Sequence, residues 1–395
     1  MKGVDFMGKL LTVALVFVFF LGAAYAEELE DVKKEVEWQK KVIEGLEKRV
    51  EELEKEGGAA RGQEAGVFRR FGINLGIFGD INFSTRSNEK ENNGFSLGAA
   101  SLYSTANIGE RLNFLVEVGV EFDEEETNLD IERLWAGYTF SDLFIVRLGR
   151  HHTAMGYWNR IYHHGKLLFY SIDRPFFLQF EDSNGVIPIH IVGLELSGST
   201  VTPAGRITYD IEAGNGPELM EDSDMAGKFN LNVSNAGDGN NSKQAVARVS
   251  FEPTAIEGLK IGVFGTNFKV EDSTMSMHEA IFGADVYYKR GGFELVSEYF
   301  RLKNGGTPAA NAYYIRVAHE IGEFVPYLRY ETLDGKDDDP YLGILSGGAD
   351  RSQYIAGVRY DVDPLHSAIK AQYRYDDTEG EKLRNVFELQ WAFHF

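Results

Sequence analysis

The sequence has no cysteine and, after its first 26 residues, no long apolar run. Without cysteine there is no disulfide framework to support the fold. Without an apolar segment of about 20 residues, a bundle of membrane-spanning helices is excluded. The one membrane architecture left open is a closed β-barrel, because its apolar band uses alternate residues and leaves overall hydropathy modest.

The chain also lacks an excess of positive charge. It carries 61 acidic and 40 basic residues, for a net charge of −21. Nucleic acid is therefore not an expected partner, since binding to its phosphates requires clustered lysine and arginine. No phosphate-binding glycine loop and no metal-ligand spacing is present, so we expect no cofactor.

Residues 1–26 have the pattern of a signal peptide. Lys2 and Lys9 precede an apolar run from Leu10 to Leu21, and Ala24-Tyr25-Ala26 has the small-x-small form of a cleavage site. The alternative is a membrane anchor, but the apolar run is shorter than the roughly 20 residues that cross a bilayer.

Residues 27–56 predict a coiled coil, and residues 57–70, which begin Gly57-Gly58, predict a flexible linker. Apolar residues recur here at alternating spacings of three and four, which places them in one stripe, or seam, along a helix, as is typical of helices that associate. A single solvated amphipathic helix is the alternative. The seam consists of Leu29, Val32, Val36, Gln39, Ile43, Leu46, Val50 and Leu53.

From residue 71 to residue 395 the apolar period changes to two, as in half-apolar strands. In the last segment Phe387, Leu389, Trp391, Phe393 and Phe395 alternate with polar or small residues. Turn signals divide this region into about 16 strands, which predicts an all-β, 16-stranded antiparallel transmembrane barrel. The expected spans are 71–83, 95–107, 111–122, 129–140, 143–152, 188–198, 205–214, 243–251, 259–268, 278–289, 292–302, 311–320, 323–333, 350–361, 366–376 and 383–395.

The connections between these strands alternate in length. Those after odd strands are mostly long, such as 153–187 and 215–242, whereas those after even strands are short, such as Ser141-Asp142. A soluble β-sandwich has no reason to sort its loops in this way, but outer-membrane barrels have short periplasmic turns and long external loops. An even strand number then puts both ends of the barrel, and the coiled coil, on the periplasmic side.

The order of these segments, ending in Phe395, resembles trimeric bacterial outer-membrane porins. Within them the nearest likeness is to the phosphate-selective O/P-type group, because Arg147-Leu148-Gly149-Arg150-His151-His152-Thr153-Ala154-Met155-Gly156 resembles its motif before the inward loop. The resemblance implies a homotrimer, an inward third loop that narrows the pore, and a terminal aromatic residue read by the assembly machinery. It does not carry over phosphate selectivity, because the lysines and arginines responsible cannot be aligned here.

The connection 153–187 occupies the position of that inward loop and is rich in aromatic residues. We expect it to fold into the barrel, although it could instead be a surface loop that covers the mouth. The side chains expected to line the opening are Arg160, His163, His164, Asp173, Arg174, Glu181 and Asp182.

Counting alternate positions from the apolar face predicts which charged side chains point into the barrel. Bases outnumber acids among them, although the whole chain is acidic. Acidic runs such as residues 123–126 fall in the outer loops, where they could bind lipopolysaccharide through divalent ions. The expected wall residues are Arg111, Glu117, Glu121, Arg147, Glu195, Arg248, Arg329, Glu331, Arg359, Lys370, Arg374, Arg384 and Glu388.

Five of the nine histidines fall within 40 residues, at positions 151, 152, 163, 164 and 190. Imidazole and nearby carboxylates could bind a divalent metal. Adjacent residues on a strand point to opposite faces, however, which argues against a shared site for His151 and His152. We therefore expect no metal.

Together these patterns predict a non-enzymatic porin of the outer membrane that passes small hydrophilic solutes or ions by diffusion. One alternative is a structural or partner-binding barrel, either a sheath for a periplasmic electron carrier or an envelope tether. A third is an outer-membrane hydrolase, although such enzymes use smaller barrels and no catalytic residues can be named. The permeant and the sign of its charge stay open.

Overall fold

The computed structural model leaves several short segments of the barrel region undescribed. The signal peptide, coiled coil and linker expected in residues 1–70 lie outside the described residues. Residues 71–395 form one unit. The structure describes residues 72–395 except 87–92, 123–126, 163–164, 223–224, 234–236, 239–240, 272–275, 306–307 and 364–365.

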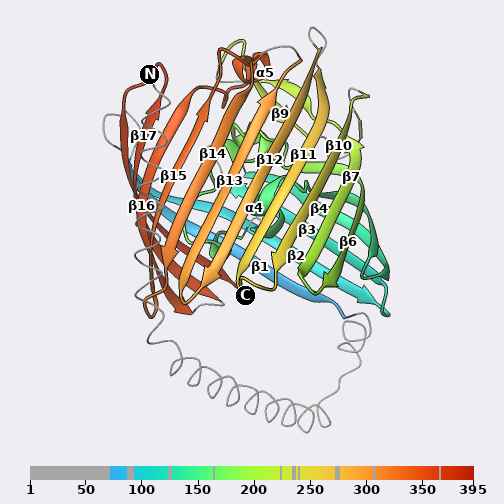
Figure 1. The fold of residues 1–395 in the computed structure, drawn as a ribbon. Helices are drawn as coiled ribbons and strands as arrows, with labels where there is room; N and C mark the ends of the chain where they lie inside the picture. The colour runs from blue at the N-terminus through green and yellow to red at the C-terminus, as the bar shows by residue number, and fades with distance from the viewer. Residues whose placement is uncertain are drawn as a thin grey trace. The chain divides into compact units, whose positions relative to one another are not determined.

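Sixteen strands form one closed antiparallel barrel, which confirms the fold that the alternating residues predict (Figure 1). Strands adjacent in the chain pair with each other, β7 pairs with β10, and β1 pairs with β18 to close the ring. The barrel strands are β1 (Asn74–Arg86), β2 (Gly94–Ile108), β3 (Leu112–Phe122), β4 (Thr127–Ser141), β5 (Phe144–His152), β6 (His190–Thr202), β7 (Gly205–Asn215), β10 (Lys243–Pro253), β11 (Leu259–Glu271), β12 (Ser276–Arg290), β13 (Phe293–Lys303), β14 (Ala310–His319), β15 (Phe324–Asp334), β16 (Arg351–Asp363), β17 (Ser367–Thr378) and β18 (Arg384–His394).

The long connections contain short elements that the sequence pattern did not reveal, because segments this short show no clear period. Strands β8 (Glu218–Glu221) and β9 (Phe229–Asn232) form a separate hairpin between β7 and β10. The β5–β6 connection holds α4 (Gly156–Ile161) and the 3₁₀ turns η2 (Lys166–Leu168), η3 (Phe176–Leu178) and η4 (Glu181–Ser183), while α5 (Pro340–Ile344) precedes β16. Among the described residues, no helix is both long and apolar enough to cross a membrane.

The turns at one end of the barrel are short, as expected. Between β12 and β13 only Gly291 and Gly292 make the turn, with φ of +57° and +76°. Glycine adopts this left-handed backbone without the steric penalty of a Cβ atom. The connections that carry α4, the β8–β9 hairpin and α5 all leave the opposite end.

The outward face of the barrel is a belt of exposed apolar side chains. Leu97, Leu148, Val263, Leu328 and Trp391 are exposed on five different strands. A large exposed apolar surface is rare on proteins that meet only water, whereas a lipid-facing barrel requires one. A row of tyrosines crosses neighbouring strands on this face, with ring centroids 4.8 to 6.2 Å apart; it comprises Tyr313, Tyr330, Tyr354 and Tyr375.

The last residue takes part in barrel closure. The Phe395 backbone N–H donates to Ile77 O at 3.0 Å, and Phe395 O accepts from the Ile77 N–H at 2.7 Å. Because these are backbone contacts, they do not depend on the aromatic ring, which is largely exposed.

Candidate functional site in the barrel interior

Part of the inner wall carries a cluster of apolar side chains. Phe264, Phe268, Val296 and Phe300, on strands β11 to β13, are buried and belong to one large apolar cluster. Their partners come from the long connections. Residues 153–189 contribute Met155, Trp158, Phe169, Phe177, Leu178, Val186, Ile187 and Ile189, and the α5 connection contributes Tyr341, Leu342 and Leu345.

The β5–β6 connection is also held to the wall through its own backbone. The Trp158 N–H donates to Glu298 Oε1 at 2.7 Å, and Tyr314 Oη donates to the same oxygen at 2.7 Å. Further along, the Ile172 N–H donates to Gln372 Oε1 at 3.1 Å. Inward side chains of β13, β14 and β17 therefore satisfy polar groups that burial would otherwise leave unpaired.

Three of the bases expected to line the pore bind the connection. Arg329 donates to Ser171 Oγ at 2.9 Å and to Asp173 O at 2.6 Å. Arg359 donates to Leu167 O, and Lys370 donates to Ser171 O at 2.8 Å. All three side chains are buried. They contact backbone carbonyls and the Ser171 hydroxyl of the connection.

Other charged side chains in the interior remain partly exposed to solvent. Arg147 on β5 and Arg160 on α4 both contact Glu195, and Arg160 also binds Asp210 at 2.7 Å. Arg374 pairs with Glu388 at 3.1 Å. These guanidinium groups mark a part of the interior that water reaches.

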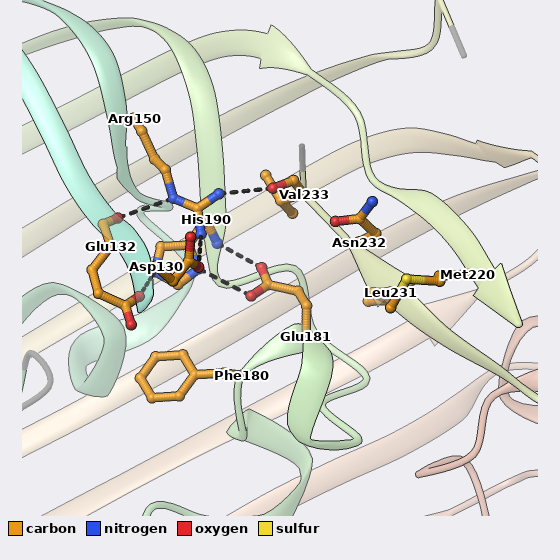
Figure 2. Close-up of a pocket in the computed structure, with 10 residues that line it drawn as sticks. All are labelled: Asp130, Glu132, Arg150, Phe180, Glu181, His190, Met220, Leu231, Asn232 and Val233. Atoms are coloured by element: carbon orange, nitrogen blue, oxygen red, sulfur yellow. Dashed lines mark hydrogen bonds and ion pairs between the residues drawn. The ribbon is translucent and has the colours of Figure 1, made fainter. Parts of the chain in front are cut away.

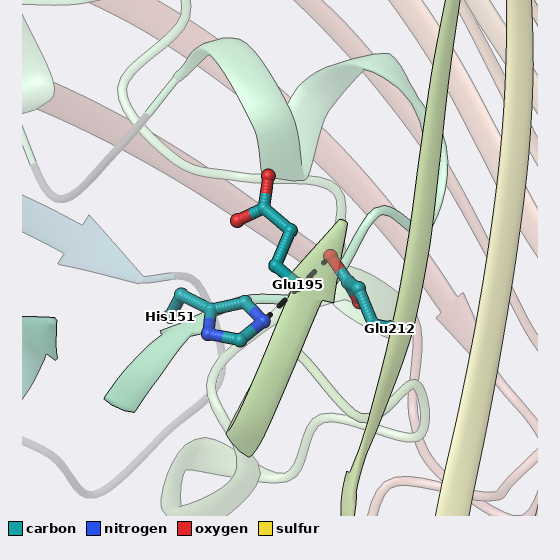
Figure 3. Close-up of side chains that lie close together, drawn as sticks. All are labelled: His151, Glu195 and Glu212. Carbon is teal, nitrogen blue, oxygen red and sulfur yellow. Dashed lines mark ion pairs between the residues drawn. The ribbon is translucent and has the colours of Figure 1, made fainter. Parts of the chain in front are cut away.

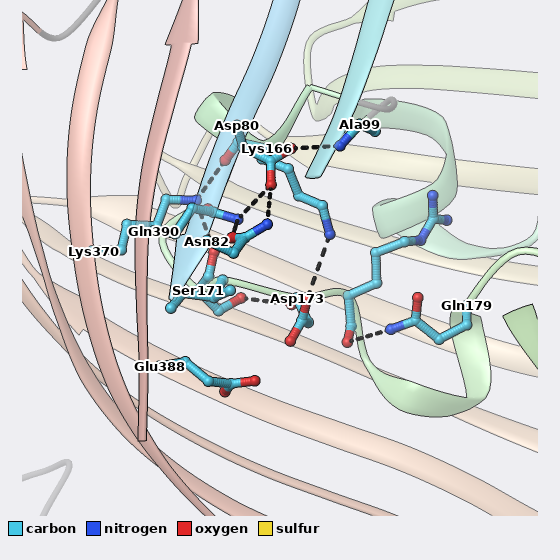
Figure 4. Close-up of polar contacts among 12 residues, drawn as sticks. Asp80, Asn82, Ala99, Lys166, Ser171, Asp173, Gln179, Lys370, Glu388 and Gln390 are labelled. Carbon is cyan, nitrogen blue, oxygen red and sulfur yellow. Dashed lines mark hydrogen bonds and ion pairs between the residues drawn. The ribbon is translucent and has the colours of Figure 1, made fainter. Parts of the chain in front are cut away.

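Figure 4 shows polar contacts between β1 and β18 and others within the β5–β6 connection. Asn82 Nδ2 donates to Asp80 Oδ2 at 2.7 Å, and Gln390 Nε2 donates to the same oxygen at 3.3 Å. Lys166 Nζ lies 3.4 Å from Asp173 Oδ1, and both side chains are partly exposed. Burial disfavours the charged form of Asp173, but Lys166 and two nearby arginines outweigh it and lower the pKa of this carboxyl.

A small pocket lies at the start of β6 (Figure 2). Arg150 donates to Glu132 O at 3.1 Å and to Val233 O at 2.7 Å, and Asp130 lies 3.5 Å from it. Glu181 accepts from the His190 backbone N–H at 2.8 Å. The pocket thus gathers three carboxylates, the Arg150 guanidinium and the His190 imidazole, which pair with one another.

Glu181 and Arg174 in the connection have shifted pKa values. Burial disfavours the Glu181 carboxylate, but the imidazole of His190 and its hydrogen bonds, helped by Arg150, hold the pKa at about 2. Burial lowers the pKa of Arg174 to about 10, against the opposing effect of Glu181 and other acids. The Arg174 guanidinium stacks 4.3 Å from the centre of the Phe180 ring. Both residues are buried, so they stabilise the connection and do not face open solvent.

The other side chains expected to line the pore lie in several different environments. Arg111 is exposed in the turn between β2 and β3, and Arg384 is partly exposed at the start of β18. Glu117 is buried and accepts from Arg133 Nε at 2.6 Å, while Arg248 is buried against Asp285 at 2.8 Å. His163 and His164 lie outside the described residues, as do the side chains of Glu121 and Asp182.

Arg316 is an interior residue that sequence reasoning missed. It is buried, binds Glu294 and Tyr162 Oη, and lies 5.4 Å from the centre of the Trp158 ring. Its alternation with outward Ile315 and Val317 on β14 is the signal that could have found it. Arg316 connects the wall to α4 through charge and ring contacts.

No family model matches the chain, and no curated protein matches its sequence. Solved structures do resemble it. The fold is shared with porins. The anion-selective porin from Comamonas acidovorans has a TM-score of 0.56 at 13% identity, and the similarity covers 82% of this chain and 99% of that one. The outer-membrane channel DcaP of Acinetobacter baumannii has a TM-score of 0.53 at 11% identity over 82% and 97%. OmpT of Vibrio cholerae has a TM-score of 0.51 at 11% identity over the same shares.

Proposed function

We propose that the chain is an outer-membrane porin, a passive diffusion channel for small hydrophilic solutes or ions. The observation that carries this proposal is a closed barrel with an apolar outer belt and partly solvent-exposed charged side chains inside. An exposed apolar belt favours a lipid environment, and charged groups in contact with water inside it favour a solvated path across the membrane.

In this proposal the connection 153–187 narrows the path from one side. Its aromatic residues pack on the apolar wall of β11–β14, and Arg329, Arg359 and Lys370 hold its backbone. Such dense packing favours a fixed insert with a constant size limit over a mobile gate. Arg147, Arg160, Lys166 and Arg374 line what remains open.

We further propose a preference for anions. In several interior ion pairs the base faces solvent while its acid lies behind it. Arg147 is 25% exposed and Glu195 1%, and Arg351 is 27% exposed and Asp376 2%. Permeating ions therefore meet guanidinium groups first, although each pair is neutral as a whole.

The proposed setting follows from the asymmetry of the barrel ends. The long connections would face outside, where acidic runs could meet lipopolysaccharide through divalent ions, and the N-terminal coiled coil would lie in the periplasm.

A homotrimer is proposed as well. A trimer form is described for one of the similar structures, OmpT of Vibrio cholerae, at a TM-score of 0.51 and 12% identity. Native mass of the detergent-solubilised protein tests the trimer.

Planar-bilayer recording of the purified, folded protein tests the channel. We expect stepwise conductance and, in a KCl gradient, a reversal potential of the sign that anion preference requires. Deleting residues 160–180 should raise single-channel conductance, because it removes the carbonyls that Arg329, Arg359 and Lys370 anchor to the wall. A folded protein that stays silent contradicts the channel, and an unchanged conductance in a folded deletion variant contradicts the constriction.

A further inference from the structure

Three buried side chains from adjacent strands converge where the β5–β6 connection begins. His151 lies on β5, Glu195 on β6 and Glu212 on β7, and one potential ligand atom from each lies within 4.8 Å of the others. Figure 3 shows the imidazole and the Glu212 carboxylate facing each other, with Glu195 beside them. We propose that this cluster binds a divalent transition-metal ion.

Two of the ligand atoms have no hydrogen-bond partner in the described part of the chain. His151 Nε2 and Glu212 Oε1 are both buried there without a hydrogen-bond partner. They lie 3.9 Å apart, which is too far for a hydrogen bond between them. Two facing polar atoms that are buried and share no hydrogen bond leave a place for a third group between them.

The tautomer of His151 suits a metal ligand. His151 Nδ1 lies 3.2 Å from Gly149 O, so Nδ1 carries the proton that it donates to this carbonyl. The lone pair is then on Nε2, the atom that faces Glu212. Metal-binding histidines are commonly held in this way by a backbone carbonyl on the other ring nitrogen.

The local charge and spacing also admit a cation. Glu195, Glu212 and Asp210 bring three carboxylates, against the two guanidinium groups of Arg147 and Arg160. Two ligands of a tetrahedral Zn²⁺ ion are roughly 3.3 Å apart, so small side-chain shifts would close the site. One imidazole with two carboxylates favours ions such as Zn²⁺ or Mn²⁺.

A bound ion would fasten the start of the connection to the wall. Glu212 already accepts the Ala154 backbone N–H at 3.1 Å, and Glu195 binds Arg160 of α4. The ion would join both carboxylates to His151. This inference goes beyond the proposed channel, because metal binding is measured without a bilayer.

Isothermal titration of the folded full-length protein with ZnCl₂ tests the site. We expect one Zn²⁺ per chain, with affinity at least tenfold weaker in His151→Ala and in Glu212→Gln. Glutamine keeps an oxygen for the Ala154 N–H, so this variant should fold. His319→Ala, at an exposed histidine on β14, is the control and should bind like the unchanged protein. Undiminished binding in both site variants would overturn the proposal and leave only adventitious zinc.

X-ray absorption at the zinc edge of the unmodified protein keeps the test independent of the folding of variants. The proposed site predicts one imidazole and otherwise oxygen ligands at about 2.0–2.2 Å. Two or more imidazoles would place the ion elsewhere, and an ion bound only by oxygen at the surface would exclude His151. Either result overturns the assignment.

Discussion

Truncating Leu178 should loosen the inward connection, whereas truncating Leu168 should not. Both leucines lie in 3₁₀ turns of this segment, but Leu178 is fully buried in the apolar cluster and Leu168 is 40% exposed. A buried Leu→Ala substitution costs about 2–5 kcal/mol through lost burial and the cavity left behind. At an exposed position the cost is usually within about 0.5 kcal/mol.

The lost packing free energy should appear as local opening, because the barrel strands keep their own hydrogen-bonded ladder. Each change of about 1.4 kcal/mol alters the equilibrium constant for opening tenfold. A loss of about 2 kcal/mol in Leu178→Ala should therefore raise the open population of the connection by roughly 30-fold or more. Hydrogen exchange of its backbone amides measures this population directly. In bilayers the same variant should show increased current noise at unchanged voltage.

Leu168→Ala is the matched control, since it has the same chemistry, the same connection and the same helix type. Its amides should exchange at close to the rate of the unchanged protein. Equal exchange in the two variants would refute the reasoning, because it would mean that burial in the apolar cluster does not hold the connection in place.

Other consequences can be measured separately. Arg160→Gln should shift the reversal potential toward cations, because Glu195 and Asp210 lose a positive partner in the solvent-exposed part of the interior. Arg290→Gln, at the exposed end of β12, should leave the reversal potential unchanged. Phe395→Ser should lower the amount of the protein in the outer membrane, because the backbone hydrogen bonds of residue 395 survive and only recognition of the aromatic ring is lost. Phe324→Ser, at another exposed phenylalanine, should leave that amount unchanged. Equal amounts of the two variants on immunoblots would contradict this. Lowering the pH from about 8 to 5 should increase anion preference, because histidines with a pKa near 6.5 gain charge as the pH falls through that value. Glu181, with its pKa held at about 2, stays ionised throughout this range and does not contribute to the shift. Replacing both His163 and His164 with alanine should therefore remove much of the shift in reversal potential.

The strands could be predicted because the alternation of apolar and polar residues along the chain shows which side chains face lipid and which face the interior. Phe387, Leu389 and Trp391 alternate with Glu388 and Gln390, and such a period of two identifies both the strand and its outward face. Register follows from the turns, which Gly291 and Gly292 keep short. These are local properties, so they can be read without knowing what lies across the barrel.

Which inward side chains meet water could not be predicted in the same way. Arg329 and Arg147 both point inward by parity, yet Arg329 is buried against Ser171 and Arg147 is partly exposed. The difference depends on the path of the β5–β6 connection, whose backbone covers Arg329 and leaves Arg147 partly exposed. That path is set by packing between residues more than a hundred positions apart, such as Trp158 and Glu298.

The sequence by itself determined the barrel and its strand number, because an alternating apolar period is a property of consecutive residues. Only the tertiary structure decided which inward side chains are buried against the β5–β6 connection and that His151, Glu195 and Glu212 meet. His151 stands 44 and 61 positions from those carboxylates, and neighbouring strands bring them together through backbone hydrogen bonds that carry no sequence signal of their own.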